Sequence, residues 1–430
     1  MKKIISLVLA CTLLLALTAC GGTSSTTTSA NSGTGNSDVI KIGVLVPLTG
    51  AQTQSGVEVQ ALLKLFQDTI NSEKGEINLP FSEGVGLPNL NGAKVEFVIG
   101  DLSTPDIAMA EAERLITEEG VIGLAGNFSS ASTKTALVPA EKYGVILLSE
   151  GTSESLTEAN YKYFGRTYPG DDTFIRDTFE YITTLNDTED AGIKTVAIVC
   201  EDSEFGSNIG KTERKWAEEY DFDIVEDISY SATSSNMTSE VLRLKQADAD
   251  VVIMSSYIAD ALLFMSTFKE QNYMPKMLFG QRGGYATSDF LGNLGADADY
   301  VFSTARWNTD FDVQVSQDLA ALYKEKYSGG IDLIGDVLAS AWDAYVLAII
   351  ANQAGSTDVE AMRAEMSKGI EIDPAQDPTG LPGYKYGANG QNEYTTSIVI
   401  QYKDNALHTV YPQDVASSKG VYPALGWNER

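Results

Sequence analysis

Short apolar runs alternate with longer amphipathic stretches along most of this chain, and this limits the folds open to it. Residues 40–46 are almost continuously apolar, and residues 57–70 repeat apolar side chains at helical spacing. The alternation stops at a polar break and restarts at residue 195. Apolar strands that alternate with helices are typical of a mostly parallel sheet covered on both faces. Two such series predict an α/β protein with two doubly wound parallel-sheet lobes.

The expected elements follow from this periodicity. In the first series, strands are expected over residues 40–46, 95–99, 121–124 and 145–148, and helices over 57–70, 107–116 and 132–143. In the second, strands are expected over 195–200, 224–228, 251–255 and 277–279, and helices over 206–220, 239–246 and 259–270. Residues 74–92, rich in Gly, Pro and Asn, are expected to be a surface insertion.

The first 20 residues have the pattern of an export signal. Lys2 and Lys3 precede an apolar run over residues 4–19 that is slightly short for a membrane span. The run ends Leu17-Thr18-Ala19-Cys20-Gly21, which resembles the lipobox of bacterial lipoproteins. That resemblance implies a signal peptide over residues 1–19 and a lipid on Cys20. The alternative is a plain signal peptide that happens to contain a Cys.

The segment after Cys20 is expected to be a flexible tether. Of the 18 residues 21–38, 14 are Gly, Ser or Thr, so this stretch has almost no apolar content to bury. Residues 20–38 would then link a lipidated Cys to the folded body. We expect the protein on the extracytoplasmic face of a bacterial membrane, held there by acyl chains without a spanning helix.

Charge and composition exclude several classes of function. Lys and Arg total 30 against 59 Asp and Glu, a net charge of −29, which argues against a nucleic-acid partner. A single His, His408, argues against a His-based metal site or a Ser-His-Asp triad. The chain has no G-x-S-x-G and no G-x-x-x-x-G-K-[ST] motif. We therefore expect no enzyme, no metal and no cofactor, and we expect Cys200, inside an apolar run, to be a buried core thiol.

Polar loops follow the expected strands, where open parallel sheets bind ligands. Ser129, Ser130, Ser132 and Thr133 lie where a strand ends and a helix begins. Free backbone N–H groups and the helix dipole favour an anion there, and hydroxyl groups add donors. A carboxylate is the natural occupant. The alternative is that Ser130 and Ser132 only cap the helix.

These loops resemble the type I periplasmic solute-binding proteins, in the branch that binds leucine, isoleucine and valine. The resemblance covers residues 39–405. Each marker is weak alone, but their order and spacing together are specific. The markers are Pro47-Leu48-Thr49-Gly50, Leu90-Asn91-Gly92, Gly126…Ser129-Ser130…Thr133, Ser149…Thr152…Leu156-Thr157, Phe164-Gly165-Arg166-Thr167, Phe205-Gly206, Ser256-Tyr257, Trp342-Asp343-Ala344 and Gly387-Ala388-Asn389-Gly390.

The resemblance implies a set of ligand-binding residues. In the family, the second Ser of the pair and the Thr after the next strand hold the α-carboxylate, which implies Ser130 and Thr152 here, with Ser129 beside them. Family members commonly have an aromatic residue at the position of Ser55, so the pocket is expected to be more open there. Tyr257 matches a family Tyr that touches the ligand, although a surface aromatic is the alternative. Weaker candidates are Phe205, Tyr168 and Asp202.

One departure concerns the ligand's amino group. Members that bind free amino acids usually have an acidic residue after the strand that here ends near Gly280, and Arg282 stands in its place. A guanidinium would repel an ammonium and attract a carboxylate, and Arg306 could add a second positive group. Glu150, beside Thr152, could instead supply the acid. This leaves open an acidic or non-amino ligand; the alternative is an alignment slip or an Arg paired with a neighbouring carboxylate.

The family also implies two lobes joined by three crossovers, near residues 167–168, 303–304 and 380–390. The first lobe is expected to cover residues 39–167 plus 304–380, and the second lobe residues 168–303 plus 381–405. The C-terminal segment 406–430 lies beyond the resemblance. A solute would bind between the lobes, and hinge closure would present it to a membrane partner.

The expected partner is the permease of an ABC importer, with the chain acting as a monomer. A sensor subunit that passes the closed state to a membrane receptor is the alternative.

Overall fold

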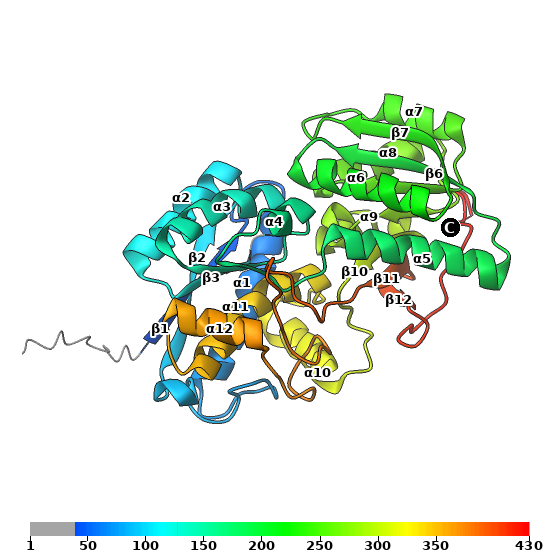
Figure 1. Ribbon diagram of the computed structural model, residues 1–430. Helices are drawn as coiled ribbons and strands as arrows, with labels where there is room; N and C mark the ends of the chain where they lie inside the picture. Colours follow the sequence, from blue (N-terminus) through cyan, green and yellow to red (C-terminus); the bar gives the residue numbers. More distant parts are fainter. Residues whose placement is uncertain (1–38, 127, 430) are drawn as a thin grey trace, which may run out of the picture. The chain divides into compact units, whose positions relative to one another are not determined.

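The computed structural model describes residues 39–126 and 128–429. The expected signal peptide, the lipid site at Cys20 and the tether lie outside the described residues. Two sheets, each covered by helices on both faces, account for the described part of the chain (Figure 1).

The first sheet has five parallel strands in the order β2-β1-β3-β4-β5. Its side chains alternate between two cores: Ile42 and Val44 of the first strand belong to one apolar cluster, and Leu45 belongs to another. The strands are β1 (Val39–Val46), β2 (Lys94–Asp101), β3 (Gly123–Gly126), β4 (Ile146–Ser149) and β5 (Phe164–Arg166).

Helices cover both faces of this sheet, and we call the whole assembly lobe 1. One face packs against α2 (Pro105–Arg114) and α3 (Ser130–Tyr143). The other packs against α1 (Thr53–Asn71) and α11 (Gly335–Ala354). The remaining helical segments of lobe 1 are η1 (Pro88–Leu90), η2 (Leu115–Glu119), α4 (Glu154–Glu158), α10 (Gln314–Leu322), η5 (Tyr323–Tyr327) and α12 (Val359–Lys368).

The second sheet, with its helices, forms lobe 2. Its seven strands run in the order β12-β11-β10-β9-β8-β6-β7, and only the pairs β10–β11 and β11–β12 are antiparallel. The strands are β6 (Thr195–Glu201), β7 (Asp223–Tyr230), β8 (Val251–Ser255), β9 (Leu278–Gly280), β10 (Val301–Ala305), β11 (Ile398–Lys403) and β12 (Ala406–Tyr411).

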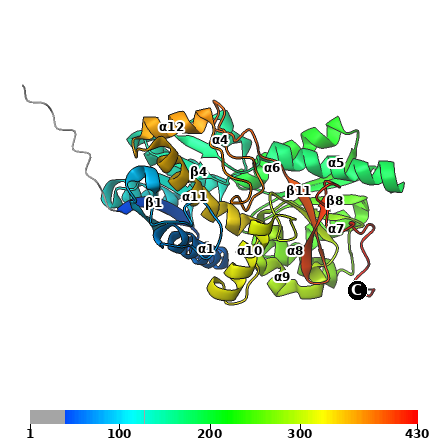
Figure 2. The ribbon, with the colours of Figure 1, turned by 90° about the horizontal axis from the view of Figure 1, so that it is seen from below.

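Two helix layers enclose the second sheet (Figure 2). On one face lie α5 (Asp171–Glu189) and α6 (Glu204–Glu219), and on the other α7 (Thr238–Ala247), α8 (Ile258–Glu270) and α9 (Ser288–Leu294). The short turns η3 (Gly283–Ala286) and η4 (Gly295–Ala298) flank α9. Because β12 extends this sheet, residues 406–411 of the C-terminal segment are part of lobe 2.

The predicted fold class is confirmed, and every predicted strand and helix is present with ends that differ by up to four residues. The prediction for residues 74–92 is wrong in part. This segment does connect α1 to β2, but Leu79 and Leu87 are fully buried in the core of lobe 1. The high content of Gly, Pro and Asn in this segment gave no indication that these two leucines are buried. Cys200 is buried, as expected.

The chain passes between the lobes in three segments, after β5, after β10 and after α12. The first and third are hydrogen-bonded to each other: Arg166 N donates to Gly390 O at 2.7 Å, and Asn392 N donates to Arg166 O at 2.9 Å. In the middle segment the chain stays in the second sheet through Ala305. The exact residues at which the lobes divide remain predictions.

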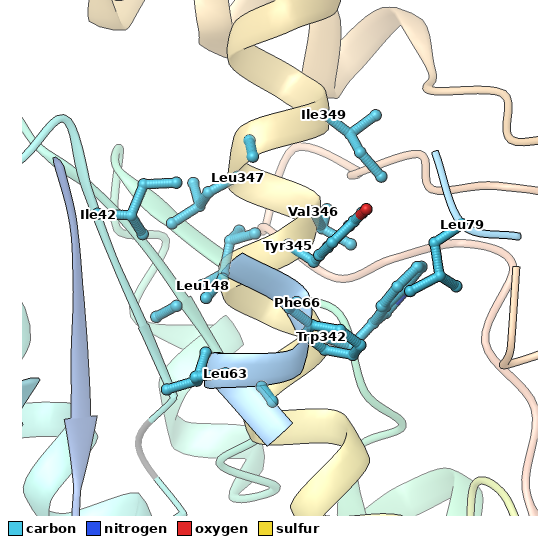
Figure 3. Packing of buried hydrophobic residues seen from close by; sticks show 14 of the residues in the cluster. Ile42, Leu63, Phe66, Leu79, Leu148, Trp342, Tyr345, Val346, Leu347 and Ile349 are labelled. Atoms are coloured by element: carbon cyan, nitrogen blue, oxygen red, sulfur yellow. The ribbon is translucent and has the colours of Figure 1, made fainter. Parts of the chain in front are cut away.

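Helix α11 is the centre of the lobe 1 core. Its Trp342 and Tyr345 rings stack with centroids 4.9 Å apart, and both contact the edge of Phe66 from α1 (Figure 3). Among the described residues, α11 alone is long and apolar enough to cross a membrane. Its residues from Asp336 to Ala351 are all buried, which identifies it as a core helix.

A buried acid marks the core of lobe 2. Glu213 of α6 is fully buried, and its carboxylate accepts hydrogen bonds from Cys200 Sγ at 3.1 Å and Ser255 Oγ at 2.7 Å. Burial raises the pKa of Glu213 to about 7, although the two hydrogen bonds lower it in part.

Replacing Trp342 with Ala should lower the free energy of unfolding by about 3–5 kcal/mol, because it leaves a cavity beside Phe66 and Tyr345. Urea unfolding monitored by circular dichroism measures the change. Val57→Ala is the control, since Val57 on α1 is 53% exposed, and should change stability by less than about 0.5 kcal/mol. Equal losses in both variants would contradict this core assignment.

Glu213 should make the protein less stable as pH rises. Its folded-state pKa of about 7 exceeds the unfolded value near 4.5, so between these values only the folded state holds the proton. Relative to Glu213→Gln, the wild type should lose about 3 kcal/mol of stability between pH 4 and pH 8. Urea unfolding across this range tests the difference. Glu218→Gln, at an exposed position of the same helix, should run parallel to the wild type; a parallel Glu213→Gln curve would refute the assignment.

Candidate functional site

The N-terminus of α3 is joined to the loop after β4 through side-chain hydroxyls. Ser129 is the cap of α3, and its side chain accepts a hydrogen bond from Ser132 N at 3.4 Å. Ser130 is buried, and its Oγ accepts from Ser153 N at 3.3 Å. Ser132 Oγ donates instead to Leu102 O at 3.1 Å. The capping residue is therefore Ser129, and the alternative that Ser130 and Ser132 cap the helix is wrong.

Thr152 lies in that loop beside the start of α5. It is buried, and its carbonyl oxygen accepts hydrogen bonds from Asp171 N at 3.0 Å and Arg166 Nη1 at 2.7 Å. Asp171 is also buried, and neither of its carboxylate oxygens has a well-formed hydrogen bond within the described ranges. Burial raises the pKa of Asp171 to about 7, with the Thr152 side chain acting in the opposite sense. The loop therefore places a buried carboxyl group with a raised pKa next to Thr152.

Arg282 follows β9 and reaches across to lobe 1. Its Nη2 lies 3.0 Å from Asp336 Oδ1 and 3.7 Å from Glu150 Oε2. Its guanidinium carbon lies 4.4 Å from the centre of the Tyr168 ring and 4.9 Å from that of Phe174. The backbone at Arg282 has φ +43 and ψ −127, a conformation that costs free energy for a residue other than Gly. Of the possibilities left open by the sequence, an Arg paired with neighbouring carboxylates is the one observed.

Glu150 is fully buried beside this guanidinium. Its Oε1 accepts a hydrogen bond from the Ser340 hydroxyl, and its Oε2 has no hydrogen-bond partner among the described residues. Burial raises the pKa of Glu150 well above its usual value, the Asp336 carboxylate raises it further, and Arg282 opposes both. The buried carboxyl groups of Glu150 and Asp336 therefore flank one guanidinium, whose charge also acts to lower the pKa of the buried Asp171.

Tyr257 brings lobe 2 against the α3 N-terminus. Burial raises the pKa of Tyr257, and the nearby Ser129 side chain acts in the opposite sense. The Tyr257 ring centre lies 6.0 Å from that of Phe128 and 5.4 Å from that of Phe205. Tyr257 is therefore no isolated surface aromatic, and Phe205 supports it from α6.

Tyr168 lies in the same region, at the first crossover. Its hydroxyl donates to Asp336 Oδ1 at 3.1 Å and accepts from Arg306 N at 3.3 Å. We call the assembled group the interlobe cluster. Its members are Ser129, Ser130, Glu150, Thr152, Tyr168, Asp171, Tyr257, Arg282 and Asp336.

Two sequence candidates, Ser55 and Asp202, lie apart from the interlobe cluster, and a third, Arg306, touches it through its backbone N–H but directs its side chain elsewhere. Ser55 is in the first turn of α1, and none of the described contacts joins it to the cluster. Arg306 points its Nη2 at Thr379 O, 2.9 Å away. The Asp202 carboxylate accepts from Ala232 N at 3.0 Å.

Sequence reasoning missed two members of the cluster, Asp171 and Asp336. Each lies in the first turn of a helix, where acidic residues are common for electrostatic reasons alone.

Metal binding has no support in the described ranges, where no three His, Cys, Asp or Glu side chains are arranged to hold an ion. The cluster instead combines hydroxyl groups and a helix N-terminus on one side with buried carboxyl groups on the other. The first suits an anion and the second a cation.

Comparison with known proteins places this arrangement in a family. The sequence profile of the periplasmic binding protein family matches residues 39–405. A Leu/Ile/Val-binding protein homolog 7 from Brucella suis is 30% identical over 393 residues, which cover 88% of this chain and 93% of the relative. A Leu/Ile/Val-binding protein homolog 8 from Brucella abortus is 28% identical over 389 residues, covering 88% and 92%.

Solved structures agree at the level of the fold. The substrate-binding protein LivJ from Streptococcus pneumoniae, in complex with isoleucine, has a TM-score of 0.71 at 20% identity and covers 87% of this chain and 100% of its own. A solute-binding protein of an ABC transporter from Rhodopseudomonas palustris, in complex with 3,4-dihydroxybenzoic acid, has a TM-score of 0.72 at 17% identity, covering 91% and 100%. The chain therefore belongs to the type I periplasmic binding proteins of the branched-chain amino-acid family.

Proposed function

We propose that this chain is the extracytoplasmic solute-binding lipoprotein of an ABC importer, and that it captures an amino acid between its two lobes. The observation that carries the proposal is that the interlobe cluster contains groups that favour an anion beside groups that favour a cation. The α3 N-terminus suits a carboxylate, and a surplus of buried carboxyl groups beside it suits an ammonium group. An α-amino acid carries both groups on one carbon atom.

The carboxylate end rests on Ser129, Ser130 and Thr152. Backbone N–H groups at the start of a 14-residue helix carry partial positive charge, and the hydroxyl groups can donate to an anion. Isoleucine and 3,4-dihydroxybenzoic acid, the ligands of the two solved relatives, both contain a carboxyl group. A carboxylate at this end is therefore what the two kinds of ligand share.

The ammonium end rests on unsatisfied acids. Glu150 Oε2 and Asp336 Oδ2 are buried without hydrogen-bond partners in the described part of the chain, and neither oxygen of the buried Asp171 has a well-formed hydrogen bond there. Arg282 compensates only part of this negative charge. A buried unpaired carboxylate is unfavourable, and an ammonium group would supply both charge and donors.

A solute with a carboxyl group and no amino group is the second candidate. Its support is the unpartnered Nε of the buried Arg282, together with the aromatic acid bound by the Rhodopseudomonas palustris relative. This solute would leave the acids of Glu150 and Asp171 unpaired, so we favour the amino acid.

The remaining steps of transport follow from the two-lobe fold. Arg282 of lobe 2 lies against Asp336 and Glu150 of lobe 1, and Tyr257 of lobe 2 lies near Ser129 of lobe 1. A solute bound here would therefore touch both lobes. Affinity that is greater for the closed arrangement drives closure. The closed monomer would then deliver its solute unchanged to the permease, while the lipid on Cys20 keeps it at the membrane.

Binding of an amino acid at pH 7 should release protons. Burial raises the pKa of Asp171 to about 7, so Asp171 is about half protonated in the free protein at pH 7, and burial raises the pKa of Glu150 well above its usual value, which favours its protonated form. A bound ammonium would lower both pKa values and expel up to about one proton per solute. Calorimetric titration of neutral amino acids in buffers of different ionisation enthalpy measures the number released.

The same titration separates the two candidates. Tight binding of benzoate-type acids without proton release, and no binding of amino acids, would replace the first candidate by the second. Ser130→Ala should weaken solute binding by about 10-fold or more, because a hydrogen bond to a charged group is lost. Ser266→Ala, an exposed position on α8, is the matched control and should bind as the wild type does.

Cys20→Ser should move the protein from the membrane fraction to the soluble extracytoplasmic fraction, because no acyl chain can then be attached. Fractionation of cells that express each variant, followed by immunoblotting, measures the distribution. Cys11→Ala is the control, since Cys11 lies within the expected signal peptide. Membrane retention of Cys20→Ser would refute lipid anchoring at this residue.

A further inference from the structure

A pocket of about 560 Å³ lies between the lobes and shares no residue with the interlobe cluster. Its wall includes Gln54 of α1, Ser288 and Asp289 of α9, and Leu407 of β12. Pockets of this size accommodate small molecules. No activity described above uses it.

One carboxyl group, that of Asp289 in lobe 2, lines this pocket, and a second, that of Glu58 in lobe 1, lies directly behind its wall. Glu58 of α1 is 2% exposed, and its Oε1 accepts hydrogen bonds from Gln54 Nε2 at 2.8 Å and Ser288 Oγ at 2.5 Å. Both donors line the pocket. Glu58 Oε2 is buried with no hydrogen-bond partner in the described part of the chain. The Asp289 carboxyl group lines the pocket itself and is close enough to raise the pKa of Glu58, which burial raises first.

No cation of the described chain compensates this pair. Neither Glu58 nor Asp289 takes part in a salt bridge within the described ranges, and no Lys, Arg or His lines the pocket. Asp332, the other acid that lines the pocket, differs because Lys324 Nζ lies 2.7 Å from its Oδ1. The negative charge that lacks a partner is therefore concentrated where the two lobes meet.

The rest of the wall is largely apolar. A metal ion would fill only a small part of a volume of about 560 Å³ and would leave this apolar wall unused. A cationic head on a short hydrocarbon body would place its charge at the acids and its carbon atoms against the leucines and isoleucines. The apolar side chains are Leu291, Ile331, Leu333, Ile334 and Leu407.

We propose that this pocket is a second binding site, for a small organic cation such as a primary amine with a short branched aliphatic body. The ammonium group lies against Asp289, beside the Gln54 and Ser288 side chains that are hydrogen-bonded to Glu58, and the aliphatic part packs against the apolar wall. Because Asp289 comes from lobe 2 and Gln54 and Ile331 come from lobe 1, the bound amine links lobe 1 to lobe 2. The proposal stands whether or not the interlobe cluster binds an amino acid.

Calorimetric titration of the full chain with isopentylamine tests this site, with isopentanol and isovalerate as neutral and anionic analogues. The amine should bind at least 10-fold more tightly than the alcohol, and isovalerate should bind more weakly than either. Asp289→Asn should weaken amine binding about 10-fold or more, and Glu58→Gln should weaken it less, because Glu58 lies behind the pocket wall. Asp221→Asn, an exposed position of lobe 2 with φ +56 that suits Asn, is the matched control and should leave it unchanged.

Three results would overturn the proposal. The first is equal affinity for amine and alcohol, which would show that charge is not recognised. The second is loss of amine binding in Asp171→Asn with retention in Asp289→Asn, which would place the amine in the interlobe cluster. The third is displacement of the amine by millimolar Mg²⁺ or Ca²⁺ in the wild type but not in Asp289→Asn, which would identify a metal site.

Discussion

The burial of the Arg282 guanidinium between the lobes is the interaction on which the rest of the site depends. A buried cation is very costly unless it is paired and hydrogen-bonded. Arg282 finds its closest carboxylate, Asp336, on a helix of lobe 1, while Tyr168 and Phe174 cover its faces. Its pairing is complete only when the lobes meet. The arrangement between the lobes is therefore coupled to this one side chain, and the surplus of acid around it is what the proposed solute would meet.

A second buried guanidinium fixes the loop that faces the solute. Arg166 Nη1 donates to the carbonyl oxygens of Thr152 and Ser153 at 2.7 and 3.0 Å, and its Nε donates to Gln391 Oε1 at 2.5 Å. Gln391 Nε2 in turn donates to Tyr168 O at 3.0 Å, so two crossovers and the loop share one anchor. Because Arg is always charged and its donors form a rigid fork, the anchor resists distortion. Rotation about the crossovers thus leaves Thr152 in a fixed place relative to them.

Local sequence patterns predict the helices, the strands and part of the candidate site. The residues that they miss depend on contacts between parts of the chain that are distant in sequence. Apolar periodicity predicts the strands and helices, and the rule that ligands lie at the carboxyl ends of strands points to Ser130 and Thr152. Asp171 and Asp336 were not predicted, because an acid in the first turn of a helix is ordinary until a buried guanidinium is seen beside it. Likewise, no local pattern indicates which carboxylate pairs with Arg282. Leu79 was missed because its burial depends on α11, more than 250 residues away.

The acidic character of the chain has two physical meanings. Most of its 59 acidic residues can be solvated, but Glu58, Glu150, Asp171 and Asp336 are buried near the surface where the lobes meet. Burying more carboxyl groups than cations makes the closed arrangement costly by itself, since each acid must take up a proton or remain unpaired. A cation that enters between the lobes removes this cost only in the closed arrangement. The affinity of such a cation would therefore differ between the open and closed states, and in the proposed function that difference drives closure.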